Sequence, residues 1–461
     1  MSAADLESSA LEAYHAAANG AQELIRHNVW DEGIEKWKRA LDDVAPYITS
    51  EQLDLFKRHF DNFFQLRRDE NAPSDDTGSD SSESQYGYEK QYTILSFNSA
   101  RNDDWFSNLQ KTTHNFVYGE NREFWPAQPV RVAILDSGFA LTGEAHKAMK
   151  PYWSRIKDKR TFTDEFPLPQ TPLEKQKALD DPVGHGTTVA YQLMKTCPSA
   201  HVYIAKVTVA ESDHKQAVPD KAAISRAIRY AAAPIAEGGW GVDVINMSFG
   251  WSESELPGTM EAAEGVSGAI ELAEKKGVLL FAAASNYGLS QPNDVLYPAR
   301  DSRIIPVDAE DGLGNPAPFA LHSQRGSGGV RYCAPGLSVD SPVSAVQMCG
   351  SSFACPVAAG VAALVLEFAR HQDVSLSKSE SVKRALSSAK GMLKVFGPMS
   401  QQAVNHPGFN MLYPWFFLGN TQREEVALNI IRQLEIEFGK GNVGHEVVWT
   451  TTWQAVQNYS K

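Results

Sequence analysis

Three short segments of this chain carry side chains that can do acid–base or nucleophilic chemistry. Asp136 follows a short apolar run and precedes Ser137 and Gly138. His185 lies between two glycines at the start of a helical stretch, and Ser352 follows a glycine and a serine that open an apolar helix. A hydroxyl becomes a useful nucleophile when an adjacent base removes its proton. These three residues are therefore the first candidates for a catalytic site.

Each candidate also has a plainer structural interpretation. An acid just past a strand is more often a turn former or helix cap, and a lone histidine is more often a surface or core residue. Ser351 or Ser352 could cap the helix without catalysis. Pro356 is expected in the first turn of that helix, which places Ser352 at the helix N-terminus. The free backbone amides and positive dipole end there favour negative charge developing at an attacked carbonyl.

The elements that must position these residues alternate between apolar runs and helical stretches. The apolar runs cover 130–135, 202–209, 242–247 and 278–284, and the helical stretches between them include 222–233 and 260–275. Near-continuous apolar strands that alternate with helices predict a parallel β-sheet covered on both faces. The predicted class is therefore α/β, and ligand sites in such folds lie at the carboxyl ends of the strands.

Taken together, in the order Asp, His, Ser, the three segments resemble the active-site signatures of the subtilase family. Residues 244–250 resemble the family's substrate-lining strand, and residues 281–286 resemble the strand that delivers its oxyanion asparagine. Tyr297-Pro298-Ala299 and Ala334-Pro335-Gly336 also stand where subtilases carry such motifs. The resemblance covers residues 130–370 and implies a subtilisin-like three-layer fold, with a parallel β-sheet flanked by helices.

The resemblance implies a serine endopeptidase that hydrolyses peptide bonds through an acyl-enzyme intermediate. Ser352 is then the nucleophile, His185 its general base and later the general acid, and Asp136 the residue that orients the imidazole. Asn286 and the backbone amide of Ser352 are the expected oxyanion donors. The substrate is expected to be a peptide or protein, and Phe249 indicates an apolar pocket. The residues expected to border that pocket are Ser248, Phe249, Gly250, Ala283 and Ala284.

Two features depart from the family pattern. Cys355 stands where the family usually has serine or threonine, and Cys349 lies on the other side of the nucleophile. Plain packing and an oxidation-sensitive switch are the two interpretations of these thiols. Residues 150–180 are rich in charge and proline and are interpreted as a surface insertion.

The regions outside the resemblance predict a modular chain. Apolar residues at helical spacing in 11–25, 30–44 and 53–63 predict a small all-α unit over 1–68, interpreted as a regulatory or docking unit that could take a protein partner. Residues 69–85 are predicted to be an acidic disordered linker. The peptidase domain is expected over 86–400, with a helical and aromatic extension, 401–461, packed on it. A helical attachment on an intracellular enzyme resembles subtilases of filamentous fungi.

Composition bears on partners and location. A formal net charge of −13 argues against nucleic-acid binding. The apolar runs fall short of the roughly 18 residues that cross a bilayer, and the first residues lack a secretory pattern, so no membrane role and a cytoplasmic location are expected. The four scattered cysteines fit a reduced compartment. No cofactor is expected to be required, although calcium stays open without a specific motif.

Two alternatives to an active endopeptidase remain at this stage. The first is a catalytically silent binding protein on a subtilase fold, against which the intact set of Asp136, His185, Ser352 and Asn286 argues. The second is a zymogen in which the N-terminal helices inhibit the enzyme until the chain is cut in the 69–85 linker.

Overall fold

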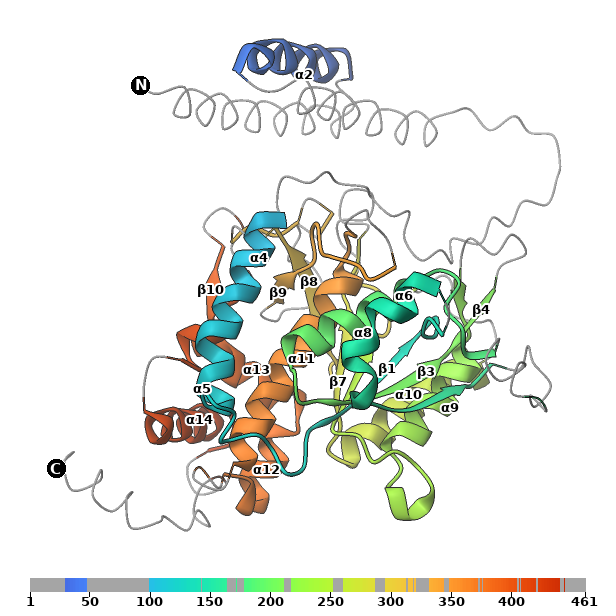
Figure 1. Ribbon diagram of the computed structural model, residues 1–461, viewed down its shortest axis with the longest axis vertical. Helices are drawn as coiled ribbons and strands as arrows, with labels where there is room; N and C mark the ends of the chain where they lie inside the picture. The colour runs from blue at the N-terminus through green and yellow to red at the C-terminus, as the bar shows by residue number, and fades with distance from the viewer. Residues whose placement is uncertain are drawn as a thin grey trace. The chain divides into compact units, whose positions relative to one another are not determined.

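The computed structural model divides the chain into two units, Met1–Glu83 and Ser84–Lys461 (Figure 1). In the first unit it describes residues 30–47, where helix α2 (Trp30–Val44) continues into the short helix η1 (Ala45–Tyr47). The helices predicted over 11–25 and 53–63, and the 69–85 linker, lie outside the described residues. In the second unit the described residues are 99–141, 143–163, 171, 178–210, 217–251, 260–286, 295–311, 314–317, 319–320, 331–343, 348–371, 374, 376–403, 406, 408–419, 422–439 and 443.

The second unit is built around a nine-stranded sheet in the order β10-β11-β9-β8-β7-β6-β1-β3-β2. Neighbouring strands run parallel except β10, which is antiparallel to β11. Strands β4 and β5 form a separate antiparallel pair. The strands are β1 (Arg131–Asp136), β2 (Ile156–Thr161), β3 (His201–Lys206), β4 (Thr208–Ala210), β5 (Ala217–Pro219), β6 (Val244–Met247), β7 (Leu279–Ala283), β8 (Ile305–Glu310), β9 (Arg331–Pro335), β10 (Ser400–Gln402) and β11 (Phe409–Leu412).

Helices cover both faces of this sheet (Figure 1). Helices α8 and α11 pack against each other and against one face, whereas α9 and α10 pack against each other on the opposite face. The longer helices are α4 (Ser99–Asn108), α8 (His185–Thr196), α9 (Lys221–Ala232), α10 (Met260–Lys275), α11 (Ser351–Arg370) and α14 (Arg423–Phe438). The shorter ones are η2 (Leu109–His114), α5 (Asn115–Tyr118), α6 (Gly143–Ala148), η3 (Lys150–Arg155), η4 (Ile235–Glu237), η6 (Leu376–Lys378), α12 (Glu380–Leu386), α13 (Ala389–Phe396), η7 (Gly397–Met399) and η8 (Pro414–Phe416).

The central strand β1 is apolar at every position from Val132 to Leu135 because both of its faces are covered. Val132 and Ile134 belong to the core cluster that contains α8 and α11, whereas Ala133 and Leu135 belong to the cluster that contains α9 and α10. Successive side chains of a strand point to opposite faces, so a strand covered on both faces must be apolar at every position. The predicted α/β fold with a parallel sheet flanked by helices is confirmed.

The interpretation of 150–180 as a surface insertion is wrong for residues 156–161. They form strand β2, which pairs in parallel with β3 at the edge of the main sheet. The strand has the sequence IKDKRT, and Lys157 and Arg160 are exposed whereas its other residues are half-buried. Charged side chains are common on edge strands, where they discourage pairing with another chain. The charge that suggested an insertion therefore belongs to a sheet edge.

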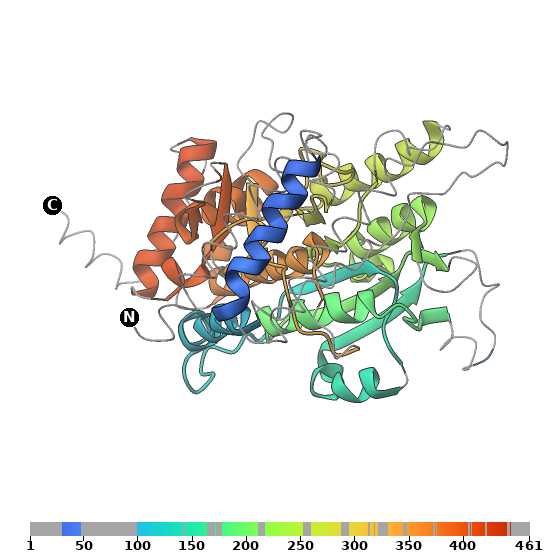
Figure 2. The ribbon, with the colours of Figure 1, turned by 90° about the horizontal axis from the view of Figure 1, so that it is seen from above.

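The segment expected to be a helical and aromatic extension, 401–461, also contributes strands to the opposite edge of the sheet. Strands β10 and β11 extend the sheet beyond β9, and helix α14 follows them as predicted. In Figure 2 these orange-to-red elements lie at one end of the unit, and the teal and green elements around β2 lie at the other.

Helix α11 overturns the expectation that no segment is long and apolar enough to cross a membrane. Over its 20 residues the mean hydropathy of its most apolar window reaches 1.8, and that window is entirely buried inside the protein. A helix that is apolar on all sides is typical of a protein core as well as of a membrane span. Here the helix packs between α8 and strands β6 to β9.

Candidate active site

The carboxyl ends of three neighbouring strands gather candidate residues at one edge of the sheet. Asp136 is the last residue of β1, Ser248 directly follows β6, and Asn286 lies three residues beyond β7. Strand β6 pairs in parallel with β1 on one side and with β7 on the other. The sheet therefore presents an acid, a serine and an amide on adjacent strands at the edge where α/β folds bind ligands.

His185 reaches Asp136 because it is the first residue of helix α8. The Nδ1 atom of His185 lies 2.8 Å from Oδ1 of Asp136, and both side chains are buried. Gly184 precedes the helix with φ of 78°, a left-handed conformation that favours glycine. At Gly186 an added Cβ would lie 2.5 Å from the carbonyl oxygen of Gly138 and 3.1 Å from Asp136 Cβ. Glycine at position 186 thus lets the helix approach β1 closely enough for the contact.

Ser352 is the second residue of helix α11, and its side chain is almost fully buried. The ring of the next residue, Phe353, lies 5.1 Å from the His185 ring between centroids, which packs the first turn of α11 against the imidazole. The N-cap of the helix is Gly350, and no side chain caps it. The alternative in which Ser352 serves as the helix cap is therefore not what the structure shows.

Pro356 corrects one step in the sequence argument. It lies inside α11, at the sixth residue rather than in the first turn. Because proline lacks an N–H, it cannot make the usual helical hydrogen bond to the carbonyl four residues earlier, which is that of Ser352. Ser352 nevertheless lies in the first turn of the helix, as its second residue.

Asn286 holds the start of α11 in place through one side of its amide. Its Oδ1 accepts a hydrogen bond from the backbone N–H of Ser351 at 2.8 Å, and Ser351 Oγ donates to the carbonyl of Ser285 at 3.2 Å. The Nδ2 of Asn286 is buried and has no hydrogen-bond partner within the described part of the chain. A buried donor without a partner is costly, so such a group calls for a functional explanation.

The residues expected to border the pocket lie around β6 and β7. Ser248 is buried and its Oγ accepts a hydrogen bond from Asn246 Nδ2 at 2.9 Å. The ring of Phe249 is part of the core on the α9 and α10 side and stacks on Trp251 with 6.2 Å between centroids. The apolar pocket inferred from Phe249 therefore has no support from the position of this ring.

Leu296 is a neighbour of this region that the sequence did not single out. A Cβ added to Gly250 would lie 2.7 Å from Leu296 Cβ, and the backbone N–H of Leu296 donates to the carbonyl of Ala284 at 2.9 Å. Ala283 and Ala284 are both buried. The signal that could have pointed to Leu296 is its place directly before the Tyr297-Pro298-Ala299 motif.

The thiols beside the nucleophile segment are both buried. Cys349 Sγ accepts a hydrogen bond from the backbone N–H of Ser338 at 3.2 Å, and Cys355 Sγ lies 4.0 Å from the carbonyl oxygen of Met247. Burial raises the pKa of the Cys355 thiol well above its ordinary value. Among the described residues, these thiols included, no group of three or more His, Cys, Asp or Glu side chains is arranged to hold a metal ion.

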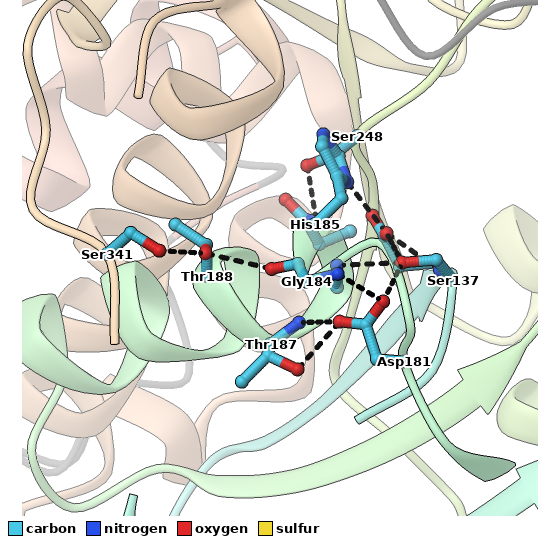
Figure 3. A network of polar contacts seen from close by, with 11 residues as sticks. Ser137, Asp181, Gly184, His185, Thr187, Thr188, Ser248 and Ser341 are labelled. Carbon is cyan, nitrogen blue, oxygen red and sulfur yellow. Dashed lines mark hydrogen bonds and ion pairs between the residues drawn. The ribbon is translucent and has the colours of Figure 1, made fainter. Parts of the chain in front are cut away.

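Sequence reasoning missed a further carboxylate, Asp181, which contacts the start of helix α8, where His185 lies. Figure 3 shows its carboxylate between Thr187 and Ser137. Asp181 is buried and its two oxygens accept hydrogen bonds from Ser137 Oγ, Thr187 Oγ1 and two backbone amides. An acid placed shortly before a helix start is a capping signal, and this could have identified it.

Comparisons with known proteins show which family this chain belongs to. The family model of the subtilase family, Peptidase_S8, matches residues 127–412. A subtilisin-like protease, het-Q2 of Podospora anserina, is 27% identical over 58% of this chain and 77% of its own length. A thermostable alkaline protease of Halalkalibacterium halodurans is 28% identical over 56% of this chain and 61% of its own length. Among solved structures, that of the Prenylagaramide maturation protease PagA is 20% identical, with a TM-score of 0.42 over 66% of this chain and 94% of that one. The family model matches more than half of the 461 residues of this chain, and the chain therefore belongs to the subtilase family of serine peptidases.

Proposed function

We propose that this protein is an active serine endopeptidase, with Ser352 as nucleophile, His185 as general base and Asp136 as the residue that orients the imidazole. The observation that carries the proposal is the 2.8 Å contact between His185 Nδ1 and Asp136 Oδ1. A carboxylate at Nδ1 leaves Nε2 as the nitrogen that can take a proton from a serine. The packing of Phe353 on the His185 ring supports Ser352 as that serine.

Acylation begins when Ser352 Oγ attacks the carbonyl carbon of the scissile peptide bond. His185 Nε2 takes the hydroxyl proton, and the carbonyl oxygen becomes an oxyanion. Asp136 stabilises the imidazolium that forms, because a negative charge in contact with Nδ1–H favours the protonated ring. The tetrahedral intermediate then collapses, the C–N bond breaks, and His185 returns the proton to the leaving amine.

Deacylation repeats these steps with water as the nucleophile. Water gives a proton to His185 and attacks the acyl ester, and the proton passes back to Ser352 Oγ as the acid product leaves. One peptide bond and one water molecule are consumed, and the three side chains return to their starting protonation states.

The proposed oxyanion donors are Asn286 Nδ2 and the backbone N–H of Ser352. The absence of a partner for the buried Nδ2 in the described residues supports this role, since an oxyanion formed during the reaction would give that donor its missing hydrogen bond. A donor that is satisfied only in the transition state lowers the barrier rather than tightening substrate binding. The positive end of the dipole of α11 adds further favourable potential at this point.

The proposed substrates are peptides or proteins, bound along the carboxyl ends of β6 and β7. Residues 248–250 and 283–284 remain the proposed borders of the pocket for the side chain that precedes the cut. Leu296 lies so close to Gly250 that no side chain would fit at position 250, which keeps the backbone open on that side of the proposed border.

A peptide library tests the proposal directly. Wild-type protein and Ser352→Ala are incubated with the library, and products are identified by mass spectrometry. Cleavage by wild type alone supports an endopeptidase. If folded wild type cuts no peptide but binds a subset of them as well as Ser352→Ala does, the chain is a silent binding protein instead. Measuring the mass of the active species separates the zymogen alternative, because a product near the full 50.7 kDa that still cleaves peptides contradicts it.

A further inference from the structure

We propose that Asp181 is a positioning residue that controls how strongly Asp136 holds the imidazole of His185, and that it acts through the hydroxyl of Ser137. The proposal rests on the proposed peptidase function of the Asp136–His185 pair. Asp181 does not contact His185 in any described interaction. Its effect is passed on by the side chain of Ser137, which lies beside Asp181 in Figure 3 and is also within hydrogen-bond distance of Asp136.

The hydrogen bonds of Asp136 show why its environment matters. Its Oδ1 accepts hydrogen bonds from His185 Nδ1 at 2.8 Å and from the backbone N–H of Ser137 at 2.7 Å. Ser137 Oγ lies 3.1 Å from the same oxygen. Each additional hydrogen bond to a carboxylate oxygen lowers its power to attract a further proton donor. The hold of Asp136 on the imidazole therefore depends on whether the Ser137 hydroxyl donates to the same oxygen.

A hydroxyl carries one proton, so Ser137 can donate to only one carboxylate at a time. Its Oγ lies 2.8 Å from Asp181 Oδ1 and 3.1 Å from Asp136 Oδ1. The shorter distance is the typical one for an O–H···O hydrogen bond, and a charged acceptor strengthens it. Ser137 Oγ also accepts the backbone N–H of Gly186 at 2.9 Å, which fixes the oxygen next to His185. Asp181 thus takes the proton that Asp136 would otherwise receive.

Both side-chain oxygens of Asp181 act as hydrogen-bond acceptors in this position. Its Oδ1 accepts Gly184 N–H at 2.9 Å in addition to Ser137, and its Oδ2 accepts Thr187 N–H at 2.8 Å and Thr187 Oγ1 at 2.6 Å. Each oxygen therefore faces one backbone N–H, which can only donate. An asparagine has a single oxygen, so its NH₂ group must oppose one of those amides.

The same contacts hold the start of helix α8 in place on both sides of His185, at Gly184 and at Thr187. Thr187 Oγ1, which donates to Asp181, accepts the backbone N–H of Ala140 at 2.8 Å and so ties α8 to the segment after β1. A purely structural role for Asp181 would follow from this capping and would affect stability alone. The test must therefore separate capping of α8 from control of Asp136.

The experiment compares wild type, Asp181→Asn, Ser137→Ala and the double variant in the full-length protein. We measure the rate of fluorophosphonate acylation of Ser352, kcat and KM on one peptide, and the melting temperature. We also record the downfield proton resonance of His185 Nδ1. Asp181→Ala is the second single variant if Asp181→Asn does not fold. The matched control is Asp220→Asn, which removes a carboxylate cap from α9, where Asp220 Oδ1 accepts the amides of Ala222 and Ala223.

The expected result for Asp181→Asn is a fall in kcat and in the acylation rate of up to about 100-fold, with KM unchanged because Asp181 contacts no substrate. The Nδ1 proton resonance is expected to shift, and in the Ser137→Ala background the effect of Asp181→Asn should largely disappear. Asp220→Asn should lower the melting temperature and leave acylation unchanged.

Two outcomes would overturn the inference. One is that Asp181→Asn lowers only the melting temperature, as Asp220→Asn does. The other is that its effect on rate and resonance is the same with and without Ser137. If wild type itself does not react with the fluorophosphonate, the proposed function fails, but the resonance of His185 still reports whether Asp181 acts on the Asp136–His185 pair through Ser137.

Discussion

The side-chain oxygen of Asn286 accepts the backbone N–H of Ser351 at 2.8 Å, and this contact decides which way the amide of Asn286 faces. An N–H can only donate, so the atom next to it must be Oδ1. Nδ2 is therefore held on the other side of the amide plane, where it has no partner among the described residues. One hydrogen bond thus joins the end of β7 to the start of α11 and leaves a donor ready for the reaction.

Asn286→Ala is expected to lower kcat by about 10²- to 10³-fold with little change in KM. This magnitude is the one known for loss of the oxyanion asparagine in a subtilisin and is not obtained from this chain. The reason is that Nδ2 gains its hydrogen bond only when the oxyanion forms. Steady-state kinetics on a cleaved peptide, with a thermal melt to confirm folding, provides the measurement. An unchanged kcat would remove Asn286 from the proposed mechanism.

Glu310 at the end of β8 is expected to make the protein less stable as the pH rises. It is fully buried, and neither carboxylate oxygen has a hydrogen-bond partner in the described part of the chain. Burial, followed by the nearby charge of Asp311, raises the pKa of Glu310 well above its usual value. The folded state therefore keeps a proton that the unfolded state releases. The contribution of Glu310 to the free energy of unfolding is therefore fully present below the ordinary glutamate pKa. It decreases as the pH rises above that value.

Glu310→Gln removes this titration and provides the comparison. Between pH 5 and 8 the unfolding free energy of wild type should fall relative to that of the variant, by at most about 1.4 kcal/mol per pH unit. Urea unfolding of both proteins at several pH values measures the difference. Parallel pH profiles for the two proteins would show that Glu310 is ionised or paired in the folded state.

Two glycine substitutions in helices are expected to have opposite effects on stability. An added Cβ at Gly360 in α11 would lie 2.7 Å from Thr196 Cβ in α8, whereas at Gly265 in α10 the nearest atom is Ser225 Oγ at 3.6 Å. Gly360→Ala must separate two packed helices and should cost about 1–3 kcal/mol. Gly265→Ala meets no obstruction and should stabilise the protein by about 0.5–1 kcal/mol.

Chemical denaturation of the two glycine variants is the measurement. Equal effects, or a more stable Gly360→Ala, would show that α8 and α11 are not in contact at this point. Because His185 is the first residue of α8 and Ser352 is the second residue of α11, the Gly360→Ala variant should also lose activity beyond its loss of folded protein.

The thiols beside Ser352 are expected to resist oxidation, which favours the packing interpretation over a redox switch. Cys349 and Cys355 are buried, and burial raises the pKa of Cys355, so little of the reactive thiolate is present. After mild peroxide treatment, mass spectrometry should find both thiols unmodified and activity retained. Oxidation of either thiol with loss of activity would support the switch.

Local patterns in the sequence predicted the positions of the main candidate residues. Asp136 ends an apolar strand and Asn286 follows one, whereas His185 and Ser352 lie in the first turns of helices. Residue type and place in the element were therefore visible together. The parallel sheet then brings Asp136 and Asn286 to the same side, because parallel strands end together. A pattern of this kind needs no knowledge of contacts. His185 and Ser352 join these two residues through the contacts of His185 with Asp136 and of Ser351 with Asn286.

Other features depend on contacts that no local pattern contains. The role of Asp181 comes from four donors supplied by Ser137, Gly184 and Thr187, and the side-chain hydroxyl that links it to Asp136 lies 44 residues away in the chain. Strand β2 was missed because a charged edge strand lacks the apolar alternation that marks a strand. The ring of Phe249 was assigned to a pocket because the pattern does not say which face of the chain packs inward.

The most direct test of the account is to identify the residue that reacts covalently with a fluorophosphonate. Wild-type protein is labelled, digested and sequenced by mass spectrometry, and Ser352→Ala, His185→Ala and Ser351→Ala are treated in parallel. The account predicts a phosphonyl adduct on Ser352 in wild type and in Ser351→Ala, no adduct in Ser352→Ala, and a labelling rate reduced by orders of magnitude in His185→Ala. Folded wild type that carries no adduct, or an adduct on Ser351 in place of Ser352, would contradict it.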